Sequence, residues 1–223
     1  NLHVEPEMLG CEGDGRAPLP GARFGRQVAY ALLVVVVGLR HGGVGLVRSG
    51  GRYAFVLEID LCRGAEGFFQ SALKLAPDDA LILREAGIFE YTKGGDINRA
   101  RRYLEKALRL YPGDFYGLFF YARILDDSGD RAGAQQRYRE VLRFVPEDSE
   151  VHTYYGRSLG AVNRLSEGYL HLAYASLYVN DDRRAKNWLE KAKTAARSPQ
   201  EKNAIKDYEK KAAERAKIMK EAR

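Results

Sequence analysis

Hydrophobic and polar positions alternate with helical spacing across residues 115–148. Apolar or small residues recur three, four and seven positions apart in its first half, and again in its second half. Ser128, Gly129 and Asp130 separate the two halves, and Pro146 follows the second. Because this triplet favours a turn and proline cannot continue a helix, the stretch predicts two helices joined by a tight turn.

The flanking sequence repeats this arrangement. Residues 80–114 place Gly94, Gly95 and Asp96 at the turn and Pro112 at the end. In both copies, small residues stand where two helices approach closely and larger ones where they interlock. These positions are Leu83, Ala86, Gly87, Ala100, Leu104 and Ala107 in one copy, and Leu118, Tyr121, Ala122, Ala134, Tyr138 and Val141 in the other.

Downstream of Pro146 the pattern changes phase. A first helix is predicted over 151–162 with its turn at Asn163, and the following helix, 166–178, itself fits a first helix. It therefore serves two overlapping units. Ser198 and Pro199 then read as an N-cap followed by proline at the first helical position. Residues 199–223 are predicted to form a charged capping helix, with a partner-binding helix as the alternative.

Upstream, the pattern fades. Residues 62–79 fit a second helix through Ala65, Phe69, Ala72 and Pro77, whereas its first helix, placed near 46–58, matches poorly. Residues 1–60 are predicted to be an irregular, glycine-rich segment. Its apolar run at 28–39 is shorter than the roughly 20 residues of a membrane-crossing helix. Three alternatives stay open for it: a buried helix or strand, a membrane-contacting segment, or the end of a larger domain.

A period of about 34 residues with these small and aromatic positions resembles the tetratricopeptide repeat (TPR) family. The resemblance implies an all-α solenoid, a right-handed superhelix of antiparallel helix pairs. We expect an array over 61–198, with units at about 46–79, 80–114, 115–148, 149–165 (partial) and 166–198. The family also implies a concave groove, lined by the first helices, that binds a partner peptide or helix.

The positions that face this groove in the family carry aromatic and charged side chains here. Tyrosine and arginine often anchor interfaces, and arginine pairs with carboxylates, so we expect a protein partner with apolar and acidic groups. The alternative is that the aromatic residues pack between neighbouring first helices. The expected groove residues are Arg84, Ile88, Tyr91, Tyr116, Phe119, Arg123, Asp126, Arg157, Tyr174 and Tyr178.

Residues 164–193 more loosely resemble the C-terminal repeat region of bacterial zinc metalloproteases of the β-barrel assembly-enhancing type. That resemblance implies a substrate-recognition or regulatory domain in the bacterial cell envelope, favoured over the cytoplasm. The HExxH motif of such proteases is absent, and His152 and His171 are expected to pack or lie at the surface. We therefore expect no enzymatic activity, no metal and no cofactor in this chain, although it fits a fragment of an enzyme. A membrane-tethered assembly factor that uses residues 28–47 is the third hypothesis.

Charge and cysteine content narrow these alternatives. The formal net charge is +6, but basic residues are interleaved with acidic ones, so we expect no nucleic-acid partner. Cys11 and Cys62 lie far apart and form no metal-binding pair, which leaves a single disulfide as an open alternative. The chain begins at Asn1 rather than Met, as a processed protein or a piece of a longer one would.

Overall fold

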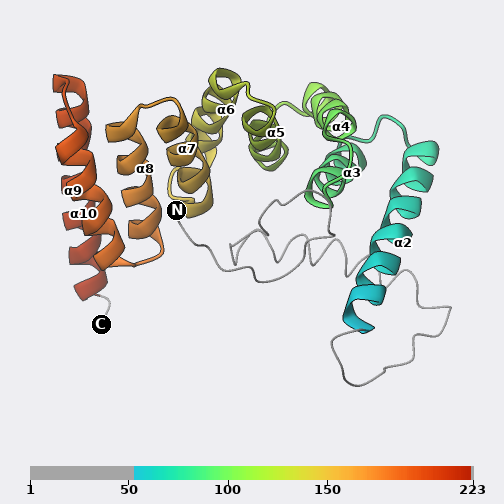
Figure 1. Cartoon of the computed structure of the whole chain (residues 1–223), viewed down its shortest axis with the longest axis horizontal. Coiled ribbons are helices and arrows are strands. Elements are labelled where there is room, and N and C mark those ends of the chain that lie inside the picture. The colour runs from blue at the N-terminus through green and yellow to red at the C-terminus, as the bar shows by residue number, and fades with distance from the viewer. Residues whose placement is uncertain (1–52, 222–223) are drawn as a thin grey trace. The chain divides into compact units, whose positions relative to one another are not determined.

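A computed structural model describes residues 53–221, and their side chains from residue 64 onward. The described residues form nine α-helices and no strand (Figure 1). The helices are α2 (Tyr53–Leu75), α3 (Ala80–Thr92), α4 (Ile97–Leu110), α5 (Phe115–Asp127), α6 (Arg131–Phe144), α7 (Ser149–Ala161), α8 (Leu165–Tyr178), α9 (Asp182–Ala195) and α10 (Pro199–Glu221). They belong to two compact units, one ending at Gly117 and the other beginning at Leu118.

Aspartates determine where most of these helices begin. The side chains of five N-cap aspartates accept hydrogen bonds from backbone N–H groups of the first turn: Asp79, Asp96, Asp130, Asp148 and Asp181. Each such cap contributes about 1 kcal/mol to helix stability. Gly94, Gly129, Asn163 and Asn180 adopt positive φ in the turns before α4, α6, α8 and α9. The first three of these positions confirm the turns predicted above.

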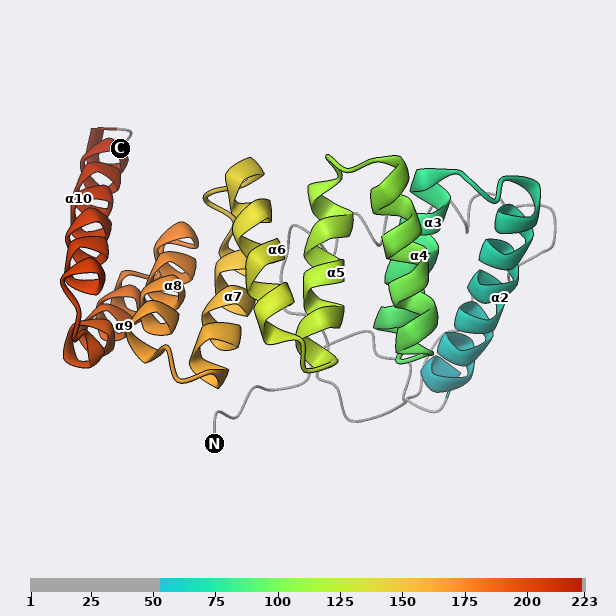
Figure 2. The same ribbon diagram turned by 90° about the horizontal axis from the view of Figure 1, so that it is seen from above.

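In the first unit, α3 and α4 pack as a tight antiparallel pair (Figure 2). A Cβ at Gly87 would lie 2.8 Å from the Leu104 Cγ atom and 3.1 Å from the Ala100 carbonyl oxygen, so the two helices leave no room for a larger residue there. Leu83, Ala86 and Ala100 are buried at this interface. These are positions that the repeat pattern assigned to helix–helix contact.

Helix α2 corrects one part of the sequence analysis. It runs without a break for 23 residues from Tyr53 to Leu75. The prediction of an irregular segment up to residue 60, and of a separate first helix near 46–58, was therefore wrong for residues 53–60. The sequence between 53 and 63 contains neither glycine nor proline, so nothing there stops the helix. Gly64 and Gly67 lie inside α2 without interrupting it.

In the second unit, aromatic rings fill the core between α5, α6 and α7. The centroid of the Phe119 ring lies 6.2 Å from that of Tyr138, which in turn lies 5.9 Å from that of Tyr155. Phe119 and Tyr138 are completely buried. Rings of this size bury large apolar areas, so this cluster is a main source of stability for the unit.

Helix α8 packs closely against both α7 and α9. Against α7 the contact is made by glycines, since a Cβ on Gly156 would lie 2.8 Å from the Gly168 carbonyl oxygen. Towards α9, Ala173 and Leu177 of α8 join a core cluster with Ala185. Small residues on opposite sides of α8 thus allow two close helix contacts.

Helix α10 covers the end of the second unit. Ser198 caps α10 as predicted, with the Glu201 N–H donating to Ser198 Oγ over 3.2 Å. The Ser198 N–H donates in turn to the Glu201 carboxylate over 2.8 Å, a reciprocal contact that the sequence analysis did not include. Ile205 and Tyr208, three positions apart on α10, are buried. Met219 is 41% exposed, so the buried side of α10 does not continue to the end of the helix.

The apolar run at 28–39 and the side chains of Cys11 and Cys62 lie outside the described residues. Among the helices that are described, none is both long enough and apolar enough to cross a membrane.

Candidate peptide-binding surface

In the first unit, Arg84 is the predicted groove residue that stays accessible. Its guanidinium lies 3.4 Å from the Asp114 carboxylate and 5.4 Å from the centre of the Tyr116 ring. Burial opposes its charge, but Glu85 and Asp114 raise the pKa of Arg84 above its ordinary value. The neighbouring Ile88, Tyr91 and Tyr116 are buried and form packing surface around it.

In the second unit, the predicted residue Arg123 lies among aromatic rings. Its guanidinium carbon is 4.2 Å from the centre of the Tyr154 ring and 5.2 Å from that of Phe120. Arg123 is only 8% exposed, and Phe119 beside it is fully buried. An arginine stacked on aromatic faces is held in a fixed orientation, as a recognition side chain requires.

Two charged residues from the predicted set lie at more accessible positions. Arg157 is exposed, and its guanidinium carbon lies 6.0 Å from the centre of the same Tyr154 ring. Asp126 is half-buried and accepts a 2.9 Å hydrogen bond from Ser158 Oγ. Burial raises the pKa of Asp126, while this hydrogen bond acts in the opposite direction.

Sequence reasoning missed two residues of this surface, Tyr154 and Glu150. The Glu150 side chain is 9% exposed, and its Oε2 atom is buried without a hydrogen-bond partner. Burial raises the pKa of Glu150 to about 7, and the positive charge of Arg123 limits the rise. A buried carboxyl of this kind is typical of functional sites. The family positions used for the prediction did not include these two residues, so only their place beside Arg123 identifies them.

The predicted residues Tyr174 and Tyr178 contact the chain's own helix α10. The Tyr174 ring packs edge-on against Tyr208 at 4.8 Å between centroids. The Lys211 ammonium and the Arg215 guanidinium lie 5.3 and 5.6 Å from the centre of the Tyr178 ring. These two tyrosines therefore fix the capping helix. Apart from them, the accessible predicted residues of the second unit are Asp126 on α5 and Arg157 on α7.

The structure also brings together two histidines that the sequence analysis treated as separate. The Nδ1 atoms of His152 on α7 and His171 on α8 lie 2.8 Å apart. His152 Nε2 lies 3.1 Å from the Pro146 carbonyl oxygen, which only accepts, so Nε2 carries the hydrogen and Nδ1 accepts from His171. Burial lowers the pKa of His152 to about 4 and that of His171 to about 3. The pair is therefore neutral at pH 7 and packs among tyrosines.

No group of three or more His, Cys, Asp or Glu side chains in the described part of the chain could hold a metal ion. The surface on α5 and α7 instead combines arginines, aromatic rings and carboxyls in the first helices of successive pairs. Its chemistry is that of recognition, through stacking and charged hydrogen bonds.

The sequence model of the tetratricopeptide repeat family matches residues 91–157. No curated protein sequence matches the chain significantly.

Among solved structures, MamA (residues 41 to the end) from Desulfovibrio magneticus RS-1 is 16% identical with a TM-score of 0.48, over 76% of this chain and 94% of that one. YrrB, described as a TPR protein with an unusual peptide-binding site, is 17% identical with a TM-score of 0.44, over 69% and 88%. Yeast Tom70 is 16% identical with a TM-score of 0.42, over 85% and 40%.

The family match spans the end of α3 to the middle of α7, which includes most of the candidate surface. Helix pairs of the same kind continue on both sides of it, with close contacts through small residues at the predicted positions. The described residues thus have a TPR-type all-α fold, and residues 91–157 match the sequence model of the tetratricopeptide repeat family.

Proposed function

We propose that this protein is a non-enzymatic interaction scaffold that binds a peptide or helix of a partner protein on the first-helix faces of α5 and α7. The observation that carries the proposal is the series Arg123, Tyr154 and Arg157, in which both guanidinium groups lie over one tyrosine ring. Residues 91–157, which match the tetratricopeptide family, contain the whole series. Proteins of that family act mainly through their binding surfaces.

The chemistry of this series favours a partner segment with acidic and apolar groups. Arg157 is exposed, and no carboxylate among the described residues pairs with it. Its charge is therefore available to a carboxylate of the partner, while the half-buried Tyr154 ring offers apolar contact area. The half-buried Asp126 on α5 adds an acceptor for a backbone N–H group of a bound segment.

The test is a selection of peptides from a random phage-displayed library against the full chain, followed by affinity measurements on the selected peptides. We expect them to combine acidic and apolar residues, and Arg157→Ala to weaken their binding by about tenfold, since arginine anchors contribute on the order of 1–2 kcal/mol. Arg183→Ala, which removes another exposed arginine from the same unit, is the control. If the selected peptides bind Arg157→Ala and the wild type equally well, this surface is not the binding site.

A role beside a cell-envelope metalloprotease stays a prediction, because it rests only on the sequence resemblance of residues 164–193. A membrane tether at 28–47 also stays a prediction, because that segment lies outside the described residues. Tyr174 and Tyr178 stay candidates for the extension of this surface within the second unit, where they contact α10. Arg84 stays a separate candidate in the first unit, where it contacts Asp114.

A further inference from the structure

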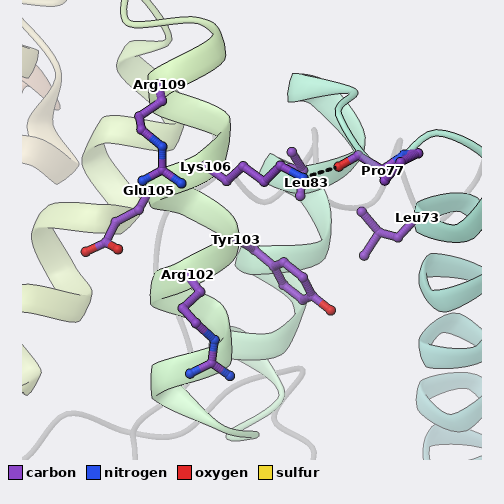
Figure 3. Close-up of a pocket in the computed structure, with 8 residues that line it drawn as sticks. All are labelled: Leu73, Pro77, Leu83, Arg102, Tyr103, Glu105, Lys106 and Arg109. Atoms are coloured by element: carbon purple, nitrogen blue, oxygen red, sulfur yellow. Dashed lines mark hydrogen bonds between the residues drawn. The ribbon is translucent and has the colours of Figure 1, made fainter.

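The first unit contains a pocket that the proposed function does not use. It has a volume of about 400 Å³ and lies where the end of α2 meets α3 and α4 (Figure 3). Leu73 of α2, Pro77 of the following loop, Leu83 of α3 and Tyr103 of α4 line it. These side chains give the pocket an apolar floor large enough for one or two apolar side chains of a ligand.

The rim of this pocket is mainly cationic and comes from a single face of α4. Glu105 and Lys106 follow Arg102 by three and four positions and precede Arg109 by four and three, which places the four residues on one side of the helix. Figure 3 shows Arg102 and Arg109 towards opposite ends of this face, with Glu105 and Lys106 between them. The rim therefore carries three positive charges and one negative charge.

The two middle residues of this rim, Glu105 and Lys106, already pair with other residues of the chain. Lys106 Nζ donates a 2.7 Å hydrogen bond to the Pro77 carbonyl oxygen and lies 2.6 Å from the Asp78 carboxylate. Glu105 accepts a 2.8 Å hydrogen bond from Arg101. Through these two contacts Lys106 holds the α2–α3 loop beside α4.

The two ends of the rim are different. Arg102 and Arg109 are exposed, and neither pairs with a carboxylate among the described residues. Their positions along α4 are seven residues apart, which corresponds to about 10 Å at the helical rise. In an extended peptide with the polyproline II conformation, which has three residues per turn, two side chains three residues apart lie on the same face and are separated by about 9 Å. The pair of arginines therefore matches two acidic residues of a ligand with two residues between them.

From this geometry we propose that the pocket binds an extended peptide segment in which two acidic residues flank two apolar ones. The carboxylates pair with Arg102 and Arg109, and the apolar side chains enter between Leu73, Leu83 and Tyr103. The site is on the α4 face of the first unit and is independent of the Arg157 surface. Because the floor is apolar and Glu105 and Asp78 stand beside it, a peptide fits better than a nucleic-acid strand, whose phosphates need no apolar floor.

The affinity of the full chain for a fluorescein-labelled Gly-Glu-Leu-Phe-Glu-Gly peptide, measured by fluorescence anisotropy, tests this proposal. We expect saturable binding that weakens about tenfold or more in the double variant Arg102→Ala/Arg109→Ala, which removes two charge-assisted contacts. Both residues are exposed, so the variant is expected to keep the circular dichroism spectrum of the wild type. Arg183→Ala, which removes an exposed arginine that belongs to neither surface, is the control and should leave the affinity for this probe unchanged.

Two comparison probes separate the parts of the argument. A Gly-Glu-Ser-Ser-Glu-Gly peptide keeps the charges without the apolar side chains, and an oligouridylate of ten nucleotides supplies phosphates only. Both should bind more weakly than the first probe. Binding of either probe with the same affinity would overturn the proposal in favour of a site for any anion. No binding of the first probe up to millimolar concentration, or equal binding by the double variant, would also refute it.

Discussion

The backbones of α7 and α8 approach closely at Gly156 and Gly168, and we predict that Gly156→Ala destabilises the protein. The new Cβ would lie 2.8 Å from the Gly168 carbonyl oxygen and 3.3 Å from the His171 Cβ. Because the first contact is with backbone, rotation of a side chain cannot relieve it. The two helices must move apart by several tenths of an ångström to reach ordinary contact distance.

The expected magnitude follows from two opposing effects. Overpacking of a tight contact costs about 1–3 kcal/mol, and a backbone obstacle favours the upper part of this range. Alanine in place of glycine in a helix interior raises the free energy of unfolding by about 1 kcal/mol, because its helix propensity is higher. We therefore expect Gly156→Ala to lower the free energy of unfolding by about 1–2 kcal/mol.

Gly160 on the same helix provides a matched control, since nothing lies within 4 Å of its ideal Cβ position. Gly160→Ala keeps the propensity gain without the clash, so it should raise the free energy of unfolding by about 0.5–1 kcal/mol. Urea unfolding followed by circular dichroism gives both values, with the slope of the transition as a check that its cooperativity is unchanged. If Gly156→Ala is as stable as Gly160→Ala, the close contact between α7 and α8 is wrong.

Three further predictions concern the second unit. Asp148→Ala should cost about 1 kcal/mol in urea unfolding because it removes the cap of α7, whereas Asp207→Ala on the exposed face of α10 should cost nothing measurable. The pKa of Glu150, about 7 in the folded protein, lies above its ordinary 4.5, so the folded state binds the proton more tightly and stability falls as pH rises through this window. Glu150→Gln should remove this pH dependence and keep up to about 3 kcal/mol of unfolding free energy that the wild type loses by pH 8. An unchanged pH profile would contradict the burial argument. The lowered pKa of His171 acts in the opposite direction, because the unfolded state then binds the proton more tightly and stability falls as pH falls below 6.5. His171→Phe should make the thermal unfolding midpoint depend less steeply on pH between 6.5 and 4. A profile as steep as that of the wild type would refute this.

The sequence by itself determined the repeat and the positions of its turns and helix ends. Proline and glycine at fixed positions limit the backbone locally, so the turns at Gly94, Gly129 and Asn163 followed from residue type alone. The cap of α10 at Ser198 was equally local. The small residues at the helix contacts also followed from the pattern, because close approach excludes larger side chains whatever the rest of the fold does.

The tertiary structure alone decided which side chains of the candidate surface remain accessible. The family pattern placed Ile88, Phe119 and Arg157 alike on the groove face, yet the first two are buried and the third is exposed. Burial depends on what neighbouring helices bring to the same place, and spacing within one helix does not contain that information. The same reason explains why the His152–His171 pair and the pocket beside α4 were not predicted: each joins residues from different helices. A repetitive sequence thus specifies its helix pairs locally, while packing between helices determines the surfaces on which binding depends.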